Sequence, residues 1–287
     1  KVIAPQEEYL DDQLDFLLKR GRENGANIFK INEKEFLKLV PDGRTSTGRA
    51  LWSPDTCVVK PKEVLNSLYK SLIERNIIFK LNTKIKSFSP EKNIITITDK
   101  YEVENIEYRY LFNTAGLQAD KVAKEFGIGK NLTIFPFKGV YWELNPKSSF
   151  QFKTNLYPVP DLELPFLGVH VTPSPDGIVN LGPTAVPAFG RENYKEFEKV
   201  EPLMTIQFIN QLFKQLIDNK GGFRKYSYEQ ALLGLKPLFY KESQKLIPKL
   251  KPNDLIRSDK VGIRAQLFNK KSKLLENDFL CLSGKTS

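Results

Sequence analysis

The chain has 287 residues, of which 40% are hydrophobic and 27% are charged. This composition is that of a globular protein with one large or two modest domains, and it excludes an unfolded chain, a collagen-like repeat and a small disulfide scaffold. The chain has 44 Lys and Arg residues against 34 Asp and Glu residues, which gives a net charge of +10. Scattered lysines favour a solvated surface, although nucleic acid, an anionic membrane and an acidic small molecule would each suit the sign of the charge.

Cysteine and histidine are too scarce for a structural metal site. The chain has two cysteines far apart in sequence, Cys57 and Cys281, and a single histidine, His170. We therefore expect no metal and a reducing compartment. No apolar run approaches the ~20 residues of a membrane-spanning helix, and the first residues lack the apolar core of a signal peptide, so we expect a soluble, cytoplasmic protein. Because the sequence opens with Lys1 and a strand-like Val2–Ala4, we also expect it to be a fragment.

The first 130 residues alternate helical and strand patterns. Apolar residues recur at helical spacing over 7–23, 33–40 and 61–73. Strand patterns follow at 77–81, 85–88, 94–98 and 108–112. Directly after the last of these come Asn113-Thr114-Ala115-Gly116 and then a helix predicted to start near Gln118. A turn of such small residues lets backbone amides approach a phosphate or a ring.

From residue 135 the strand patterns are longer and are punctuated by Pro and Gly. Strands at 140–144, 150–157, 166–171 and 178–181 indicate an antiparallel sheet. Helices are predicted at 194–200, 203–218 and 229–250, the last with a break at Pro237, before strands at 261–268 and 278–282. The order predicts a mixed α/β fold whose chain leaves one domain and returns to it. We place the boundaries so that the parts are 1–48, 49–130, 131–258 and 259–287.

Two side chains on predicted strands are candidates for chemistry. His170 lies on the face opposite Val169 and Val171, where an imidazole could accept a proton near neutral pH. The alternative is a hydrogen-bonded strand histidine without a catalytic role. Strand alternation places Arg264 and Gln266 on one face, where they could clamp a planar carboxylate. The alternative for Arg264 is an edge-strand side chain facing water.

Several common motifs are absent or incomplete. No Gly-x-Gly-x-x-Gly occurs, and the tail Gly284-Lys285-Thr286 has Phe279 where a P-loop needs its first glycine. Aromatic residues fall at core-like spacings and are not interleaved with arginines, which argues against nucleic-acid binding.

A series of ordered motifs covers essentially the whole chain. The motifs are NTAGLQAD at 113–120, PFKG at 136–139, YPVPD at 157–161, PFLGVHVTP at 165–173, LGPTAV at 181–186, RENY at 191–194 and GIRAQ at 262–266. Their order and spacing closely resemble the L-2-hydroxyglutarate oxidase/dehydrogenase family, within the D-amino-acid-oxidase-like flavoproteins.

The resemblance implies an FAD-binding domain with a Rossmann-type core, incomplete here, and an antiparallel substrate domain. It implies oxidation of L-2-hydroxyglutarate to 2-oxoglutarate, with hydride transfer from C2 to the flavin N5 and a base that takes the hydroxyl proton. His170 is then the expected catalytic residue. The substrate-binding residues it implies are Arg264, Gln266, Tyr157 and Lys138, and the cofactor-binding residues are Thr114, Ala115, Gly116, Val59 and Ile85.

The sequence departs from the family pattern in two ways. The glycine-rich turn that binds the pyrophosphate of FAD does not occur, so we expect the chain by itself to bind FAD poorly. Lys138 stands where the family has Arg, which keeps the charge but loses the bidentate geometry.

Two other functions remain open at this point. One is a sister flavoenzyme that acts on an amino acid or another hydroxy acid. The other is a non-catalytic, basic anion-binding module that associates with a membrane surface or with nucleic acid. The electron acceptor is also open between oxygen, a quinone and a carrier protein, and peripheral contact with the inner membrane is compatible with the charge.

Overall fold

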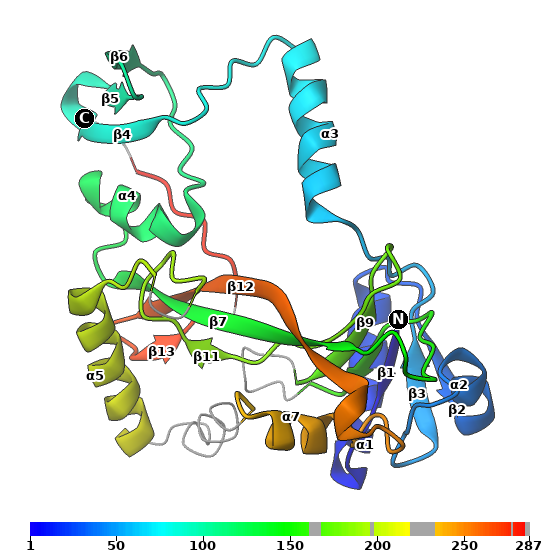
Figure 1. Cartoon of the computed structure of the whole chain (residues 1–287). Coiled ribbons are helices and arrows are strands. Elements are labelled where there is room, and N and C mark those ends of the chain that lie inside the picture. The colour runs from blue at the N-terminus through cyan, green and yellow to red at the C-terminus, as the bar shows by residue number, and fades with distance from the viewer. Residues whose placement is uncertain (161–167, 196–197, 219–232, 277, 285–287) are drawn as a thin grey trace. The chain divides into compact units, whose positions relative to one another are not determined.

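The computed structural model describes residues 1–160, 168–195, 198–218, 233–276 and 278–284. The chain forms two compact units, each built from two stretches of sequence (Figure 1). Unit 1 comprises Lys1–Lys60 and Phe137–Ile263, and unit 2 comprises Pro61–Pro136 and Arg264–Ser287. The boundaries predicted after residues 48, 130 and 258, and the roles assigned to those parts, stay predictions.

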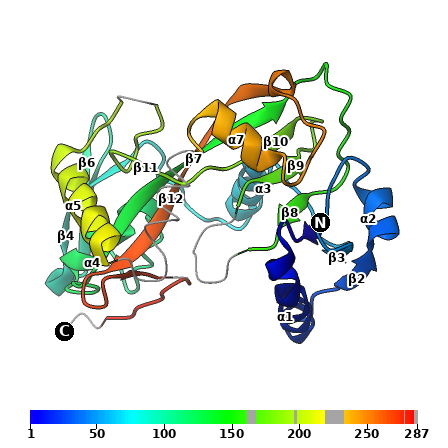
Figure 2. The same ribbon diagram turned by 90° about the horizontal axis from the view of Figure 1, so that it is seen from below.

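Unit 1 is organised around a sheet of mostly short strands (Figure 2). Strand β1 (Val2–Ala4) pairs in parallel with β8 (Leu156–Pro158) and antiparallel with β3 (Arg49–Trp52). The β1–β8 pairing joins the two stretches of sequence that make the unit. The other strands on this path are β2 (Phe29–Asn32), β9 (His170–Pro173), β10 (Val179–Gly182) and β7 (Leu132–Leu144), in the order β7-β10-β9-β8-β1-β3-β2.

The core of unit 1 is apolar and draws on both stretches. Strand β1 buries Val2 and Ala4 completely. Helix α7 (Lys236–Ser243) buries Phe239, whose ring centroid lies 5.9 Å from that of Trp142. Burying a side chain as large as Val2 or Phe239 contributes about 2 kcal/mol relative to leaving it in water. The other large side chains of this cluster that are almost completely buried are Phe36, Leu156, Leu181, Leu246, Ile247, Leu250 and Leu255.

The predicted helices near the start of the chain are confirmed. Helix α1 (Asp11–Glu23) follows a short 3-10 turn, and it buries Leu14 completely. Helix α2 (Glu33–Leu39) begins with a capping box in which the Asn32 side chain accepts from the backbone N–H of Glu35 at 3.0 Å. The capping box fixes the first turn of α2 by satisfying backbone donors that the helix leaves free.

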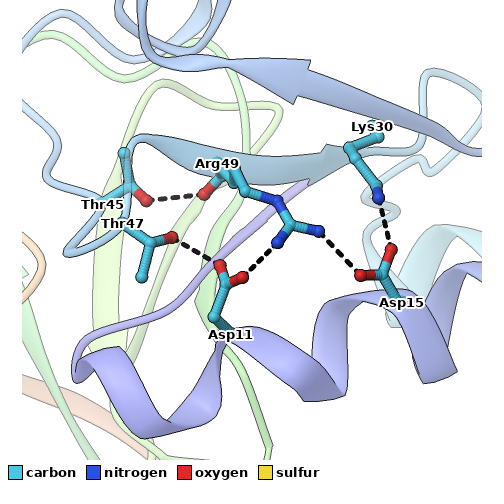
Figure 3. A network of polar contacts seen from close by, with 6 residues as sticks. All are labelled: Asp11, Asp15, Lys30, Thr45, Thr47 and Arg49. Atoms are coloured by element: carbon cyan, nitrogen blue, oxygen red, sulfur yellow. Dashed lines mark hydrogen bonds and ion pairs between the residues drawn. The ribbon is translucent and has the colours of Figure 1, made fainter.

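A network of polar contacts fastens α1 to β2 and β3 (Figure 3). Arg49 pairs with Asp11 and with Asp15, its Nη2 lying 2.8 Å from the Asp15 Oδ2. Thr47 donates to the Asp11 carboxylate at 2.7 Å, and Lys30 pairs with Asp15. Hydrogen bonds from Lys30 and then Arg49 lower the pKa of the Asp15 carboxyl group. One guanidinium therefore holds two carboxylates one helical turn apart, which fixes the rotation of α1 about its axis.

Unit 2 contains a separate three-stranded antiparallel sheet. It consists of β4 (Lys84–Ser89), β5 (Ile94–Thr98) and β6 (Val103–Glu107) in the order β4-β5-β6. Strand β5 is the central strand, and it buries Ile95 and Ile97. The unit also contains α3 (Pro61–Glu74), α4 (Ala119–Glu125), β13 (Leu274–Leu275) and parts of β7 and of β12 (Leu255–Asn269), both of which continue into unit 1.

Two predicted strands of unit 2 are wrong. Residues 77–80 and 108–112 have no regular structure, although their apolar pattern is that of buried strands. Ile78, Tyr110 and Phe112 are each at least 84% exposed. A strand needs a neighbouring strand for its backbone groups, and no strand of the described residues pairs with these stretches, although the Tyr108 N–H donates to the Asn93 carbonyl at 3.0 Å. The stretch 103–107 becomes β6 because it pairs with β5, with Ile95 opposite Ile106.

Other predictions change in extent. Strand β8 covers only the end of the predicted 150–157, because its partner β1 has three residues. The described part of 194–200 forms turns and no helix, because the Asn193 amide donates to the carbonyls of Lys195 and Glu198, both at 2.7 Å. No strand forms at 278–282. Helix α5 (Pro202–Asp218) confirms 203–218, whereas 161–167 and 219–232 lie outside the described residues.

The described residues hold no helix that is both long enough and apolar enough to cross a membrane. Nor do they gather three or more His, Cys, Asp or Glu side chains that could hold a metal ion.

Candidate active site

His170 is the first residue of β9 and is buried, with 8% of its surface exposed. Its Nδ1 lies 2.9 Å from the carbonyl oxygen of Gly168, two residues earlier. Because a carbonyl only accepts, a hydrogen bond there requires the proton on Nδ1, which leaves Nε2 with a lone pair. Gly168 suits this turn, since a Cβ at that position would lie 3.0 Å from the Pro158 Cγ. The local backbone therefore orients His170 as a proton acceptor through Nε2.

The imidazole of His170 is stacked on an aromatic ring. The ring centroids of His170 and Tyr157 are 4.0 Å apart and the planes are inclined by 16°. Lys1 places its Nζ over the Tyr157 ring, 4.1 Å from the centroid. The strand register accounts for this meeting: Tyr157 lies opposite Ile3 of β1, and Lys1, two residues before Ile3, projects to the same face.

On the other side of His170 the sheet presents a glycine and then a tyrosine. Gly182 of β10 lies opposite His170 in the register. Its φ of +127° is one that side-chain-bearing residues rarely adopt, and a Cβ there would lie 3.4 Å from the Tyr141 Cδ1. Gly182 lies between Tyr141 of β7 and His170 of β9 in the strand register, and it has no side chain to separate them. Lys260 of β12 places its Nζ 4.9 Å from the centroid of Tyr141.

These side chains form one series across unit 1, which we call the cation–aromatic row. Its residues, in the order of their strands, are Lys260, Tyr141, His170, Tyr157 and Lys1. All five belong to unit 1. The row places one proton acceptor between two ammonium groups.

Burial and charge shift the pKa values of the row, and they lower that of His170. Burial first, and then the positive charges of Lys1 and Lys260, lower the pKa of His170 from 6.5 to about 4, against an opposing effect of the Gly168 carbonyl. Burial also lowers the pKa of the Lys1 side chain, and it raises that of Tyr141, with a smaller contribution from Tyr157. His170 is therefore neutral near pH 7 and can accept a proton.

Neither ammonium group of the row has a counter-ion among the described residues. Across the part of the chain that the structure describes, no Asp or Glu oxygen lies within 4.0 Å of the Nζ of Lys1 or of Lys260. Lys1 is partly buried, and a partly buried cation is ordinarily paired, because removing a charge from water costs free energy, whereas Lys260 is exposed to water. The Lys1 end of the row is consequently suited to an anion that the described residues do not supply.

The lowered pKa of His170 predicts a loss of stability in mild acid. Unfolded histidine binds a proton near pH 6.5, whereas folded His170 binds one only near pH 4, so the unfolded state holds more protons between these values. The His170 contribution is fully present above pH 6.5 and is lost as the pH falls to about 4, with a total of about 3 kcal/mol. Urea unfolding at several pH values measures it. The His170→Asn variant should lose this part of the slope, and equal slopes in both proteins would contradict the prediction.

Lys138, predicted to bind substrate, is engaged with its own unit. Its Nζ donates to the Asn193 Oδ1 at 2.9 Å, and the same oxygen accepts from the backbone N–H of Phe189 at 3.3 Å. Strand alternation on β7 places Lys138 on the face opposite Tyr141. The structure therefore does not bring Lys138 into the cation–aromatic row, and its predicted role stays a prediction.

The predicted carboxylate pair, Arg264 and Gln266, belongs to unit 2. Arg264 is exposed, whereas Gln266 is 3% exposed and its Nε2 donates to the carbonyl of Glu276 at 2.6 Å. That hydrogen bond leaves the Gln266 Oε1 as the group that could meet a ligand. The carboxylate clamp of Arg264 and Gln266 therefore stays a prediction. Arg264, the exposed residue of the two, is its main component.

The residues predicted to touch the cofactor lie on exposed backbone. Thr114, Ala115 and Gly116 form a turn held by Asn113, whose Oδ1 accepts from the Ala115 N–H at 3.2 Å. Gly116 has a φ of +53°, and nothing lies within 4 Å of the place where its Cβ would be. A flat ring could approach this turn closely, so it fits the ring end of FAD. The sequence has no glycine-rich pyrophosphate cradle, so the fit extends to that end alone.

Two further predicted cofactor residues are less informative. Val59 is 60% exposed and lies in a stretch without regular structure. Ile85 is 50% exposed and lies on β4, beside a register shift between Ile85 and Ser87. Their predicted contacts with FAD stay predictions.

Sequence reasoning missed three members of the row. Lys1, Tyr141 and Lys260 belong to three different strand regions, and only the register brings them to His170. The one usable signal was alternation on the predicted strand 140–144, which assigns Tyr141 a face but no neighbour.

The chain matches a family model described as "FAD dependent oxidoreductase" over residues 2–248. Among curated proteins it is 31% identical to the mitochondrial L-2-hydroxyglutarate dehydrogenase of Homo sapiens, over 99% of this chain and 62% of that protein. It is 29% identical to the L-2-hydroxyglutarate dehydrogenase of an Escherichia coli strain, over 98% of this chain and 65% of that protein. The chain thus spans less than two thirds of the length of each of these two relatives.

Solved structures show a similar fold at low identity. The FAD-bound L-alpha-glycerophosphate oxidase of Mycoplasma pneumoniae has a TM-score of 0.65 and 17% identity, over 95% of this chain and 62% of that one. The L-proline dehydrogenase of P. horikoshii has a TM-score of 0.60 and 14% identity, over 93% of this chain and 59% of that one.

Proposed function

Because the chain belongs to the FAD-dependent oxidoreductase family, we propose that it supplies the substrate-binding part of an enzyme that oxidises L-2-hydroxyglutarate to 2-oxoglutarate. Membership confirms the broader predicted family, the FAD-dependent oxidoreductases of D-amino-acid-oxidase type, with its mixed α/β fold class and FAD as its cofactor. The observation that carries the proposal is the neutral His170, whose Nε2 can accept a proton and whose row has no carboxylate among the described residues beside its ammonium groups.

The proposed reaction removes two hydrogens from the C2 carbinol of the substrate. When bound, FAD supplies the two-electron acceptor, flavin N5, for the hydride that leaves C2. Nε2 of His170 takes the proton from the hydroxyl oxygen, and the C–O single bond becomes the carbonyl of 2-oxoglutarate. The stack on Tyr157 fixes the plane of the imidazole, so that the acceptor nitrogen keeps one direction during the transfer.

The anionic substrate suits the charges at this place. L-2-hydroxyglutarate carries two carboxylates near pH 7, and His170 has the positive charges of Lys1 and Lys260 near it. We propose Arg264 as a further carboxylate contact, and the turn 114–116 as a contact for the flavin ring, each as the sequence predicts. The electrons then pass to an acceptor, which the family match leaves open between oxygen, a quinone and a carrier.

Anaerobic mixing tests the proposal. The FAD-loaded full-length protein is mixed with L-2-hydroxyglutarate, and separately with its D isomer, while the flavin absorbance near ~450 nm is followed. Bleaching by the L isomer alone is the expected result. Bleaching by neither isomer, with a normal flavin spectrum, would retain the family and discard the substrate in favour of another hydroxy acid or an amino acid. A protein that binds no FAD would overturn the enzyme and favour the basic anion-binding module.

A further inference from the structure

We infer that helix α5 is a surface through which two copies of this chain associate, with their α5 helices antiparallel and Asn210 on the two-fold axis. This association is independent of the proposed reaction, since α5 contains no residue of the cation–aromatic row. The pattern and the charges of α5 itself select a second copy as the partner.

One face of α5 is fixed to the rest of unit 1. Phe208 is 1% exposed, and its ring centroid lies 5.3 Å from that of Phe137. The Thr205 hydroxyl donates to the carbonyl of Phe189 at 2.7 Å. These contacts set the rotation of α5 about its axis. Because successive residues of an α-helix are turned by about 100°, residues two positions before and after Phe208 lie on the side turned away from it.

The face of α5 opposite Phe208 carries an apolar stripe that is open to water. Asn210, also exposed, lies in the middle of this stripe. Exposed apolar residues that are scattered singly are ordinary, whereas a contiguous stripe along one helix face indicates an interaction surface. The apolar members, each between 57% and 79% exposed, are Leu203, Ile206, Phe213 and Ile217.

The stripe is nearly symmetric about Asn210, which favours a second copy as the partner. Leu203 and Ile217 lie seven residues before and after Asn210, and Ile206 and Phe213 lie four before and three after it. When the helix is reversed end to end about Asn210, apolar positions therefore fall on apolar positions. A surface that meets its own copy across a two-fold axis needs this self-complementarity, whereas a surface for an unrelated partner does not.

The polar side chain of Asn210 also favours a second copy. Against an apolar partner or the acyl region of a lipid surface, an amide in the centre of the stripe would be unpaired, at a cost in free energy. Across a two-fold axis it meets the same side chain. An amide has both a donor and an acceptor, so two asparagines can hydrogen-bond to each other and fix the register of the paired helices.

The charges at the ends of α5 favour the antiparallel direction. Asp218 ends the helix, and Lys199 is an exposed residue shortly before its start. In an antiparallel pair, Asp218 of one copy lies near the first turn of the other, where Lys199 and the positive end of the helix dipole attract it. A parallel pair would place each of these charges beside its own copy. Since Lys214 is the one basic residue of α5, the helix also lacks the Lys- and Arg-rich polar face of a membrane-surface helix.

The surface is small, so the association should be weak. Stable interfaces bury about 1,200 Å² or more, and two crossing helices of this length bury less. We expect a dissociation constant on the order of 100 µM. At about 1 µM, where unfolding is followed by fluorescence, the chain is then monomeric and Phe213 is exposed to water.

Sedimentation equilibrium of the 287-residue chain over about 10–500 µM measures the association. Asn210→Asp is nearly isosteric and places two carboxylates on the two-fold axis, so it should weaken dimerisation at least about tenfold. Gln207→Glu is the matched control: it makes the same amide-to-carboxylate change on an exposed residue of the same helix, beside the stripe, and should change the constant by less than about threefold. Phe213→Glu should abolish dimerisation. Far-UV circular dichroism checks that each variant is folded.

Disulfide cross-linking tests the direction of the helices. Cys57→Ser and Cys281→Ser are introduced first, since both cysteines are exposed. Asn210→Cys should then cross-link to its own copy. Leu203→Cys should not, because these two positions lie about 20 Å apart in an antiparallel pair. It should instead cross-link to Ile217→Cys when the two variants are mixed.

The outcomes are distinct. A chain that stays monomeric up to about 500 µM would overturn the self-association, as would equal dimerisation of the Asn210→Asp variant and the unmodified chain. Self-cross-linking of Leu203→Cys would overturn the antiparallel arrangement. A monomeric chain that binds vesicles of phosphatidylglycerol and phosphatidylcholine, and loses that binding in Phe213→Glu, would overturn the second copy as the partner and assign the stripe to a lipid surface.

Discussion

The FAD-loaded enzyme with His170→Asn should reduce its flavin about a thousandfold more slowly with L-2-hydroxyglutarate, because it lacks the base that takes the hydroxyl proton. Asparagine keeps a polar side chain of moderate size but has no titratable nitrogen. His170 is buried and makes its visible polar contact to a backbone carbonyl, so its removal changes proton transfer more than it changes the fold. Anaerobic stopped-flow measurement of the flavin absorbance gives the rate directly.

The pH profile distinguishes a base from a structural side chain. In the unmodified enzyme, kcat/KM should decrease as the pH falls through the pKa of free His170, about 4. If bound substrate raises that pKa, kcat should decrease at a higher pH. The His170→Asn variant should show neither of these two decreases, which we call the acid limbs. Tyr157→Phe is the matched control, since it keeps the stacked ring and the imidazole, and it should retain both limbs. A His170→Asn enzyme with an unchanged rate and unchanged limbs would exclude His170 as the base.

A second large effect is expected in the core of unit 1. Phe239→Ala should lower the free energy of unfolding by about 4 kcal/mol, because it removes a completely buried ring and leaves a cavity that the sheet cannot close. Phe239 lies on α7, packed against Trp142 of β7 at 5.9 Å between ring centroids. Urea unfolding followed by the Trp fluorescence measures the change.

An exposed phenylalanine serves as the control. Phe213 lies on helix α5 of the same unit and is 62% exposed, so Phe213→Ala removes the same atoms with little loss of buried area. Its free energy of unfolding should change by less than about 0.5 kcal/mol. Comparable losses in the two variants would show that burial at Phe239 does not determine the stability of unit 1.

The parts of the fold that follow from local pattern could be predicted from the sequence. Helices α1, α2 and α5 have clear apolar spacing, and β5 and β10 lie within a residue of the predicted 94–98 and 178–181. The ends of these elements are set mainly by residues nearby in the sequence.

Strands β2 and β3 were not predicted, because the alternation of apolar and polar residues over four positions is too short to distinguish a strand from a loop.

The parts that depend on a partner could not be predicted. The stretches 77–81 and 108–112 have strand-like sequences, but β structure also requires a neighbour, which sequence pattern does not report. The candidate site also contains residues that the sequence predicted and residues that it did not. Motif resemblance indicated His170 and Tyr157, whose rings do stack, whereas Lys1 and Lys260 reach them only through the strand register.

The position of β1 in the sheet has a consequence for synthesis on the ribosome. One neighbour of β1 is β3, which follows soon after it, but the other is β8, which emerges only after residues 5–155 have been made. Until then one edge of β1 has unpaired backbone groups, and such an edge can pair with other nascent or unfolded chains. The nascent chain should therefore be most prone to aggregation and most dependent on chaperones while the residues of unit 2 between the two halves of unit 1 are being translated.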